Sequence, residues 1–595
     1  MEWRLFKFIF SLKDYKLNYK TFLVPILIGL LSGIFAIGFL LSIHLFTNLF
    51  LRNIVGYKPP YPLGEGGSLD YTFEIKYPFL LPFVAAFGGL LVGLLTYFFS
   101  KESAGVGTDA AIKAFHHRKY LGLKTAIWKL ITSSITIGSG GVSGKEGPIA
   151  LVGAGIGSFI GKVLKLSDKE RDIALAVGLG AGIAGVFKAP FAGAIISSEV
   201  FYKKDFETEA LIPSFIASFI SFIVVGSVFG FSPLFSVELP EFSGFSVRDA
   251  VAYIILGIIT SFIARLMIFS LDFSKSLFSS LKIHPVFKPA LGGFLVGLLG
   301  ILTPLAIGNA YGWLQLIMLG KLNFLSPDII FLSIFIVLIA FSLTLGSGGS
   351  GGVFGPSLVI GGLTGASIYY FLSSLSFPET SSFNLGALTV VGMVSTFAAA
   401  AKAPLSTIIL VAEITGGYQL LIPATIAVAV AHFLSGEKSI FKNQVNYKID
   451  SPVHYDEFKF FILNQHKVED VMTKSVIAVE KKVSVLEASE LLKTFNISAL
   501  PVIEGETVIG IITDSDLVKA CSEEFINMSV EDIMNPNPIC LTPDLTLFEA
   551  LSILIENNIE VAPVVDSIEN KKLIGIVSDF DIGKILTKTT HFKEV

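Results

Sequence analysis

Long apolar stretches dominate this chain and restrict its possible folds more than any other feature. Six stretches are long enough to cross a hydrocarbon core of about 30 Å, at residues 21–50, 78–100, 123–138, 248–276, 285–306 and 327–345. Shorter apolar segments, interrupted by glycine, lie between them at residues 104–115, 146–164, 172–200, 354–372, 386–414 and 420–435. Only 15% of the residues are charged, against about a quarter in soluble domains. The sequence therefore predicts a helical protein that crosses a membrane many times.

The charge of the chain is divided unevenly between two parts. Residues 448–595 contain 25 acidic and 13 basic residues, a net charge of −12, whereas the preceding residues carry a net charge of +8. An acidic tail repels phosphate groups, so a nucleic-acid partner is excluded. The only two cysteines, Cys521 and Cys540, fall in this tail. One pair of cysteines makes no disulfide framework, which indicates a reducing, cytosolic tail.

The N-terminus has the pattern of a helix that lies on a membrane surface. Residues 1–20 combine aromatic and aliphatic residues with five bases, Arg4, Lys7, Lys13, Lys16 and Lys20. No short apolar core with a small-residue cleavage site follows, so we expect a cytoplasmic amphipathic helix and not a signal peptide. The positive-inside rule then predicts a multi-pass cell membrane protein whose N- and C-termini are both cytoplasmic.

The apolar part of the chain repeats itself. Residues 138–148 and 346–356 share their length, an opening Gly-Ser-Gly-Gly and a closing Gly-Pro. A Lys-Ala-Pro triplet followed nine residues after its proline by glutamate occurs at residues 188–199 and again at 402–413. Two ordered landmarks at nearly one offset indicate a duplicated unit, with repeats over about 78–230 and 285–435. In transporters, broken helices at corresponding places of two repeats mark the binding site near the membrane midplane.

The two glycine-rich loops predict a site for an anion. Pro148 and Pro356 each fall in the first turn of an apolar segment, where a missing N–H costs nothing. Two helix N-termini, with free N–H groups and positive dipole ends, would then lie in the middle of the protein. Irregular backbone at this depth is tolerated where it is buried in protein or lines a cavity. The alternative is that these glycines only allow tight helix packing.

Glu146 is the sharpest single candidate in the membrane part. A buried carboxylate at a helix start in an apolar stretch is costly and marks a functional site. When it is deprotonated it can occupy the position of an anion and block it, and protonation would release it, so Glu146 is a candidate gate. The alternative, a pair with the adjacent Lys145, is disfavoured because consecutive residues on a helix do not face each other. The corresponding residue of the second repeat is Phe354.

Three motifs together resemble the CLC family of chloride channels and chloride/proton exchangers: Gly144-Lys-Glu-Gly-Pro148, Gly352-Val-Phe-Gly-Pro356 and Pro190…Glu199. The resemblance covers residues 21–447 and implies an all-α multi-pass membrane protein of inverted-repeat architecture, a homodimer with one pathway per subunit, and Glu146 as the external gating glutamate. It also implies an anion site, with the backbone amides of two residues of the second loop at its centre. The candidate residues of this site are Ala104, Gly105, Lys145, Glu146, Gly147, Val353, Phe354 and Phe441.

Three departures from the family pattern bear on proton coupling. Ala104 stands where the family commonly has a serine, and Phe441 where it often has a tyrosine, so both hydroxyls are missing. Exchangers often carry two consecutive glutamates, the second being the internal proton acceptor, but here Glu199 is followed by Val200. These changes favour channel-like or weakly proton-coupled conduction of chloride or a similar small anion. A fully coupled chloride/proton antiporter remains the alternative. Glu199 and Glu413 are interpreted as structural.

The tail contains a second repeat, of about sixty residues. Val468-Glu-Asp-Val-Met472 recurs at residues 530–534, and Gly510-Ile-Ile-Thr-Asp-Ser-Asp516 recurs in similar form at residues 575–581. Short valine and isoleucine runs alternate with amphipathic patterns, which indicates two α/β modules. The tail resembles a cytosolic tandem CBS pair, with a linker at 448–466, domains at 467–525 and 526–588, and a terminal tail at 589–595.

Tandem CBS domains often bind adenine nucleotides such as ATP, ADP or AMP. The resemblance then places the nucleotide at Thr513, Asp516, Ser578 and Asp581, with each aspartate on a ribose and each hydroxyl near phosphate. No cofactor is required for transport, and the nucleotide would be regulatory. The alternative is that the pair serves only as a dimerisation platform.

Two other classes of protein were weighed against an anion pathway. An intramembrane metalloprotease can carry CBS domains, but it needs His-Glu-x-x-His on a helix, and none of the eight histidines has this spacing. We therefore predict that the chain is not an enzyme and has no metal site. A CBS-regulated cation transporter would show several carboxylates along its pathway, whereas Glu146 is the only acid within a glycine loop. Chloride is not distinguished from nitrate or fluoride.

Overall fold

The structure is a computed structural model that describes residues 19–66, 69–72, 74–237, 244–321, 325–377, 379–380, 383–519 and 528–589. It divides into two compact units, one up to Lys448 and the other from Ile449 onward, and each is described by itself. Residues 1–18 of the predicted amphipathic helix lie outside the described residues, as do Cys521 and the end of the chain from residue 590.

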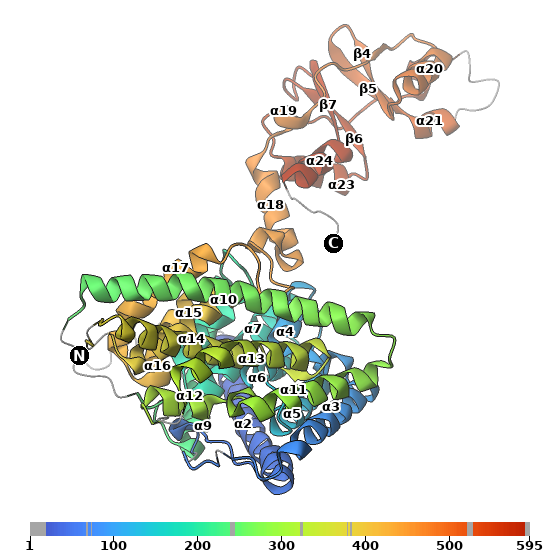
Figure 1. Cartoon of the computed structure of the whole chain (residues 1–595). Coiled ribbons are helices and arrows are strands. Elements are labelled where there is room, and N and C mark those ends of the chain that lie inside the picture. Colours follow the sequence, from blue (N-terminus) through green and yellow to red (C-terminus); the bar gives the residue numbers. More distant parts are fainter. Residues whose placement is uncertain are drawn as a thin grey trace, which may run out of the picture. The chain divides into compact units, whose positions relative to one another are not determined.

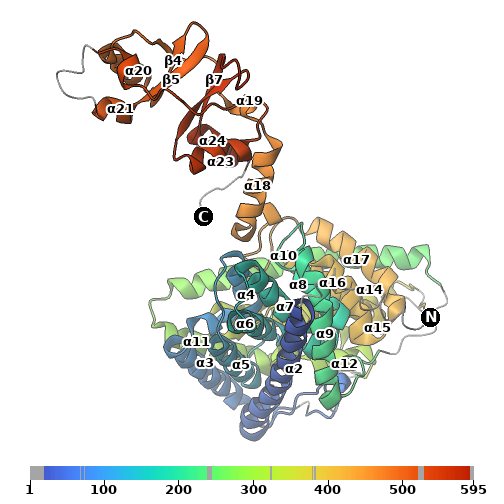
Figure 2. The same ribbon diagram turned by 180° about the vertical axis from the view of Figure 1, so that it is seen from behind.

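The first unit is built almost entirely of helices (Figures 1 and 2). Its first half contains α2 (Tyr19–Thr47), α3 (Leu81–Phe98), α4 (Gly107–His116), α5 (Leu123–Gly138), α6 (Glu146–Val163), α7 (Asp168–Phe187), α8 (Pro190–Glu199) and α9 (Thr208–Phe229). The second half contains α10 (Val247–Ser280), α11 (Lys288–Leu302), α12 (Tyr311–Met318), α13 (Pro327–Gly346), α14 (Phe354–Ser374), α15 (Leu385–Ala401), α16 (Pro404–Thr415) and α17 (Leu421–Leu434).

Within the described residues, six helical segments are long and apolar enough to cross a membrane: Phe22–Val55, Pro78–Phe98, Thr208–Phe229, Val247–Ser280, Pro285–Leu302 and Pro327–Gly346. Five of them coincide with predicted stretches. The sixth predicted stretch, at 123–138, forms α5, which has 16 residues and is shorter than the roughly 20 residues that a span usually needs. The helix Thr208–Phe229 was missed, and it contains Pro213 in its interior, where proline removes a backbone hydrogen bond.

Corresponding helices of the two halves pack in the same way. A Cβ atom on Gly153 of α6 would lie 2.0 Å from the carbonyl oxygen of Gly178 in α7. In the second half, a Cβ atom on Gly361 of α14 would lie 2.3 Å from the carbonyl oxygen of Gly392 in α15. Both pairs of helices therefore approach so closely that neither position admits a side chain. The duplication seen in the sequence extends to the packing.

The tail unit contains two α/β modules. The first has strands β3 (Val479–Glu480), β4 (Ala499–Glu504) and β5 (Thr507–Thr513), with helices α20 (Val485–Phe495) and α21 (Asp514–Lys519). The second has β6 (Val561–Val565) and β7 (Leu573–Ser578), with α23 (Leu547–Glu556) and α24 (Asp579–Thr589). In each module two neighbouring strands pair antiparallel, β4 with β5 and β6 with β7.

The two modules exchange their first segments. Met472, at the end of α19 (Val468–Val471), packs on Gly575 of β7, and Met534, at the end of α22 (Val530–Ile533), packs on Gly510 of β5. Each repeat thus begins in the core of the other module. The predicted linker at 448–466 also contains a helix, α18 (Tyr455–Gln465). Its Ile462 and Leu463 are buried in the core of the second module.

Candidate functional site

The two glycine-rich loops predicted from the repeat lie against each other. The N–H of Gly144 donates to the carbonyl oxygen of Gly352 at 2.9 Å, and the N–H of Gly352 donates to Ser143 Oγ at 2.9 Å. A third segment joins them, because the N–H of Gly105 donates to the carbonyl oxygen of Gly349 at 3.1 Å. The short strands β1 (Gly105–Val106) and β2 (Ser350–Gly351) pair in parallel there. The loops therefore form one backbone junction from three segments distant in sequence.

Glycine is required at this junction for steric reasons. A Cβ atom on Gly144 would lie 2.4 Å from the nitrogen of Gly355, and one on Gly147 would lie 2.6 Å from Cα of Gly352. A Cβ atom on Gly107, the first residue of α4, would lie 2.3 Å from the carbonyl oxygen of Gly147. The starts of α4, α6 and α14 thus converge. Helix N-termini gathered in this way present N–H groups and positive dipole ends.

Glu146, the first residue of α6, lies inside this junction and is fully buried. Its Oε1 accepts a hydrogen bond of 2.7 Å from the hydroxyl of Tyr311. Its Oε2 has no hydrogen-bond partner among the described residues. This oxygen faces both loops, since a Cβ atom added to Gly144 would lie 2.5 Å from it and one added to Gly355 would lie 3.2 Å from it. One carboxylate oxygen is therefore held and the other points into the backbone junction.

Lys145 has a different partner from Glu146. Its ammonium group forms a buried ion pair with Glu65, and the two side chains are only 1% and 4% exposed. The same ammonium group lies 5.3 Å from the ring centroid of Tyr311. The alternative that Lys145 merely pairs with Glu146 was wrong, because the ion-pair partner of Lys145 is Glu65. Because the ammonium group is engaged by Glu65, Lys145 can contribute to the predicted anion site only through its backbone.

Phe354 occupies the equivalent place at the start of α14 and is also buried. Its ring stacks on Phe397, with 3.6 Å between the ring centroids, and lies 4.9 Å from Phe187. The second loop thus presents its backbone to the junction beside an aromatic cluster. Val353, the residue before it, is the N-terminal cap of α14 and is buried as well.

The other predicted pathway residues lie as follows. Ala104 has an extended backbone and precedes Gly105, whose φ of +66° requires glycine's freedom at the loop junction. Phe441 is buried, and its N–H donates to Ser439 Oγ at 3.1 Å. No hydrogen bond or ring contact among the described residues links Phe441 to Glu146. Val200 is buried at the end of α8, and its carbonyl oxygen accepts from Gln444 Nε2 at 3.0 Å.

Glu199 and Glu413 cap each other's helices. The carboxylate of Glu199, at the end of α8, accepts from the N–H groups of Leu405 and Ser406 at the start of α16, at 2.8 and 2.9 Å. The carboxylate of Glu413, in α16, accepts from the N–H groups of Phe191 and Ala192 at the start of α8, at 2.9 and 2.7 Å. The interpretation of both glutamates as structural agrees with these contacts, since each satisfies helix-terminal donors.

The paired lysines of the repeat end α7 and α15 in the left-handed conformation. Lys188 has a φ of +54° and Lys402 a φ of +57°. Lys188 Nζ donates to backbone carbonyl oxygens of Gly64 and, at 3.0 Å, of Phe229. Lys402 Nζ donates to Ser435 Oγ at 2.6 Å. The backbone is the same in both halves, but only Lys188 ties the segment that carries Glu65.

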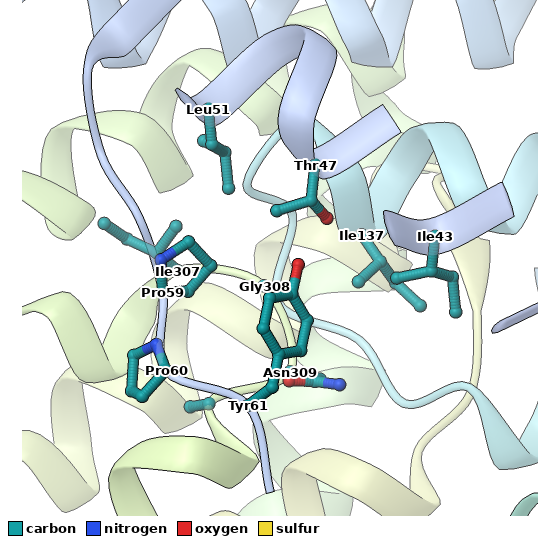
Figure 3. Close-up of a pocket in the computed structure, with 11 residues that line it drawn as sticks. Ile43, Thr47, Leu51, Pro59, Pro60, Tyr61, Ile137, Ile307, Gly308 and Asn309 are labelled. Carbon is teal, nitrogen blue, oxygen red and sulfur yellow. The ribbon is translucent and has the colours of Figure 1, made fainter. Parts of the chain in front are cut away.

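Sequence reasoning missed Tyr311 and Glu65, which contact Glu146 and Lys145. Figure 3 shows where the segments that carry them meet: Tyr61 points toward Thr47, beside Asn309 of the loop that leads into α12. The small cavity here has a volume of about 20 Å³, which is room for about one water molecule. The signal that could have pointed to Glu65 is a single acid in a segment rich in proline and glycine, residues 56–66.

In the tail, each signature hydroxyl bonds the signature aspartate of its own module. The Thr513 hydroxyl donates to Asp516 Oδ2 at 2.7 Å, and the Ser578 hydroxyl donates to Asp581 Oδ2 at 2.7 Å. Partial burial opposes ionisation of Asp581, but hydrogen bonds from Ser578 and Lys584 outweigh it and hold the pKa of the carboxyl below its ordinary value. The four predicted residues thus form two equivalent pairs, one at the end of β5 and one at the end of β7.

Fold and site together define a helical membrane protein whose two related halves meet at a junction of glycine loops around one carboxylate. A family model described as voltage gated chloride channel matches residues 88–436, and a CBS domain model matches residues 468–523 and 530–588. The chain belongs to the voltage-gated chloride channel family and carries two CBS domains at its C-terminal end. Family members are channels and transporters. The predicted resemblance and fold class are thereby confirmed.

Several relatives and solved structures are similar to this chain. The voltage-gated ClC-type chloride channel ClcB of Salmonella typhimurium is 28% identical over 70% of this chain and 96% of its own length. An uncharacterized protein of Methanocaldococcus jannaschii is 28% identical over 63% of this chain and 89% of its own. The crystal structure of a slow cyanobacterial Cl⁻/H⁺ antiporter has a TM-score of 0.60 at 22% identity, covering 71% of this chain and 96% of the other.

A second structure extends the likeness of the fold to nearly the whole chain. A eukaryotic CLC transporter has a TM-score of 0.53 at 18% identity and covers 95% of this chain and 98% of its own. At such identities the likeness shows the fold alone.

Proposed function

We propose that this protein conducts chloride, or a similar small anion, across a membrane through the loop junction, with Glu146 as the gate. The observation that carries the proposal is the position of the Glu146 carboxylate, buried between two glycine loops with one oxygen bonded to Tyr311 and the other facing the backbone. Helix N-termini bind anions, so the Glu146 carboxylate lies at a position that a permeating anion would occupy. Protonation of Glu146, or its displacement by an anion, would open the pathway.

The electrostatics of the junction favour weak binding, which conduction requires. The positive contributions are backbone N–H groups, including those of Gly147, Val353 and Phe354. The nearby full positive charge of Lys145 is neutralised by Glu65. An anion would therefore meet partial charges and could leave again. Gly105 and Ala104 belong to the same proposed pathway through their backbone.

We propose channel-like or weakly proton-coupled conduction. Ala104 and Phe441 supply no hydroxyl to hold an anion, and Val200 supplies no carboxylate to accept a proton from the inside. A fully coupled antiporter is the second candidate, because Glu146 itself can carry a proton. A cation transporter is disfavoured, since Glu146 is the only acid within the two loops and its carboxylate is enclosed by helix N-termini, which repel cations.

The test is transport in liposomes that contain the purified full chain. Chloride uptake and internal pH are recorded together for the wild type, for Glu146→Gln and for the control Glu413→Gln, which alters a half-buried carboxylate outside the loop junction. Chloride flux that does not move protons, and that loses its pH dependence only in Glu146→Gln, supports a gated channel. Proton movement against its gradient, abolished by Glu146→Gln, would establish the coupled antiporter. A wild type that carries cations and no chloride would refute both.

We also propose that the protein is a homodimer with both termini in the cytoplasm. Apolar side chains are exposed along α8, α9, α16 and α17, among them Phe191, Ile212, Leu405 and Ile422 at 49–64% exposure. A face of this kind suits lipid or a second copy. Mass measurement of the detergent-solubilised chain decides between monomer and dimer, and accessibility of Cys540 to a membrane-impermeant thiol reagent in oriented vesicles decides the side of the tail.

The CBS pair is proposed to bind an adenine nucleotide through Thr513, Asp516, Ser578 and Asp581. The support is the matched pair of hydroxyl and carboxylate groups at the same place in both modules. Calorimetric titration of the full chain with ATP, ADP and AMP tests it, with Asp516→Asn and Asp581→Asn as variants. Binding that either variant weakens supports the proposal. No heat with any of the three would leave the pair as a dimerisation platform.

A further inference from the structure

A cavity beside α10 stands apart from the anion pathway. It has a volume of about 790 Å³ and lies between one face of α10 and the loop that follows α17, residues 435–438. Its lining includes aromatic residues from α10 and charged residues from both elements, with aliphatic and small residues between them. The volume is within the range of sites that hold a small organic molecule.

The aromatic part of the lining is a stripe on α10. Phe262, Phe269 and Phe273 are 62%, 66% and 60% exposed. Intervals of seven and four residues place them on one face of the helix. Because α10 is one of the six helices apolar enough to cross a membrane, exposed rings on it suit contact with hydrocarbon chains.

The charged part of the lining leaves two cations free. Asp272 forms an ion pair with Lys442, and Glu437 forms one with Lys204, whose Nζ is 3.0 Å from the carboxylate. Both acids of the cavity are therefore neutralised from outside it. Arg265 and Lys438, which also line it, have no hydrogen-bond or ion-pair partner in the part of the chain that the structure describes. The cavity thus has an apolar stripe and a net positive end.

We propose that this cavity binds an anionic phospholipid, with its phosphate group on Arg265 and Lys438 and an acyl chain along the three phenylalanines. Basic pockets between membrane helices on the cytoplasmic side hold anionic head groups. The loop at 435–438 lies shortly before the tail unit, which begins at Ile449, and with the proposed topology this places the site in the inner leaflet. The same loop leads within a few residues to Phe441, so a bound lipid would hold the segment that carries Phe441.

The test measures lipid binding directly and needs no transport. The delipidated full chain in uncharged detergent is mixed with phosphatidylglycerol or phosphatidylcholine of the same acyl chains, and bound lipid is counted by native mass spectrometry. We expect the wild type to prefer phosphatidylglycerol and Arg265→Gln/Lys438→Gln to bind it about thirtyfold more weakly, the change that two surface charges supply. Arg248→Gln/Lys282→Gln removes the same charge from the two ends of α10 and should bind as the wild type does.

Each outcome decides the proposal. Equal binding of the two lipids by the wild type would overturn it, and so would an equal loss in the control variant. Arg265→Lys keeps the charge and should keep the preference, which separates a lost site from a lost fold. If free glycerol phosphate displaces phosphatidylglycerol completely at millimolar concentration, the site is one for a soluble anion and the lipid proposal fails. Chloride flux through the Glu146 pathway is measured separately and does not enter this decision.

Discussion

The two halves of the membrane unit place the same backbone around the junction but different chemistry upon it. The loops at 138–148 and 346–356 pair through a hydrogen bond between main-chain groups and a second one from a main-chain N–H to the Ser143 hydroxyl. At the first helical residue that follows, one half has Glu146, bonded to Tyr311, and the other has Phe354, stacked on Phe397. Duplication thus supplies the backbone geometry of the junction, and a single position in one half supplies the titratable group.

Other paired positions show which features the two halves share and which they do not. Glu199 and Glu413 make equivalent contacts in opposite directions. Lys188 and Lys402 share a backbone conformation but not a partner. The difference follows the segment at 56–66, which contacts the first half through Lys145 and Lys188.

The largest effect is expected from Glu146→Gln. If all titratable gating resides in the first half, the pH dependence of chloride flux falls to that of liposomes without protein, because the glutamine amide cannot titrate. The prediction rests on the proposed function, and chloride flux recorded in liposomes between pH 4 and pH 8 tests it. A pH dependence that survives unchanged would show that the gate lies elsewhere and would break the comparison.

Lys145→Met comes next. It leaves Glu65 buried without a counter-charge, which costs about 3–5 kcal/mol of stability. Thermal unfolding of the detergent-solubilised protein measures the loss. The double variant Lys145→Met/Glu65→Met removes both charges and should recover most of it. If the double variant is no more stable than the single one, the ion pair is not the reason for the position of the 56–66 segment.

The paired lysines should respond unequally. Lys188→Met leaves at least two backbone carbonyl oxygens without their donor and should cost about 2–3 kcal/mol, whereas Lys402→Met loses one hydroxyl contact and should cost about 1 kcal/mol. The two variants are matched in backbone conformation, so each serves as the control of the other in thermal unfolding. Equal losses would mean that the left-handed helix end, and not the partner, determines the role of these lysines.

A smaller effect than that of Lys188→Met is expected from Tyr311→Phe. It removes one hydrogen bond to Glu146, worth about 1.5 kcal/mol at the low end for a charged acceptor, so the closed position is weakened and chloride flux at neutral pH should rise about tenfold. Phe235→Leu, a change at a ring that packs 5.6 Å from Tyr311, is the control. Flux that falls in Tyr311→Phe would indicate that the hydroxyl helps the anion to pass.

The sequence predicted the junction well because its signals are local and repeated. The glycines and the proline that both copies of the motif share, with the one acid of the first copy, were enough to place Glu146 between helix starts. Tyr311 and Glu65 could not be found in this way, because they reach Glu146 and Lys145 from segments that no repeat connects with the loops. The exchange of Met472 and Met534 between the tail modules was also hidden, since a repeat reveals its length but not which copy packs on which.

The reciprocal caps at Glu199 and Glu413 have a consequence for biogenesis. The N–H groups at the start of α8 receive their acceptor from a residue 221 or 222 positions later in the chain. At roughly 5–20 residues per second, a ribosome needs about 10 to 45 seconds to supply it. The first half therefore enters the bilayer with an unfinished helix end and becomes complete only when the second half is inserted beside it, so the two halves mature together and neither is a finished product by itself.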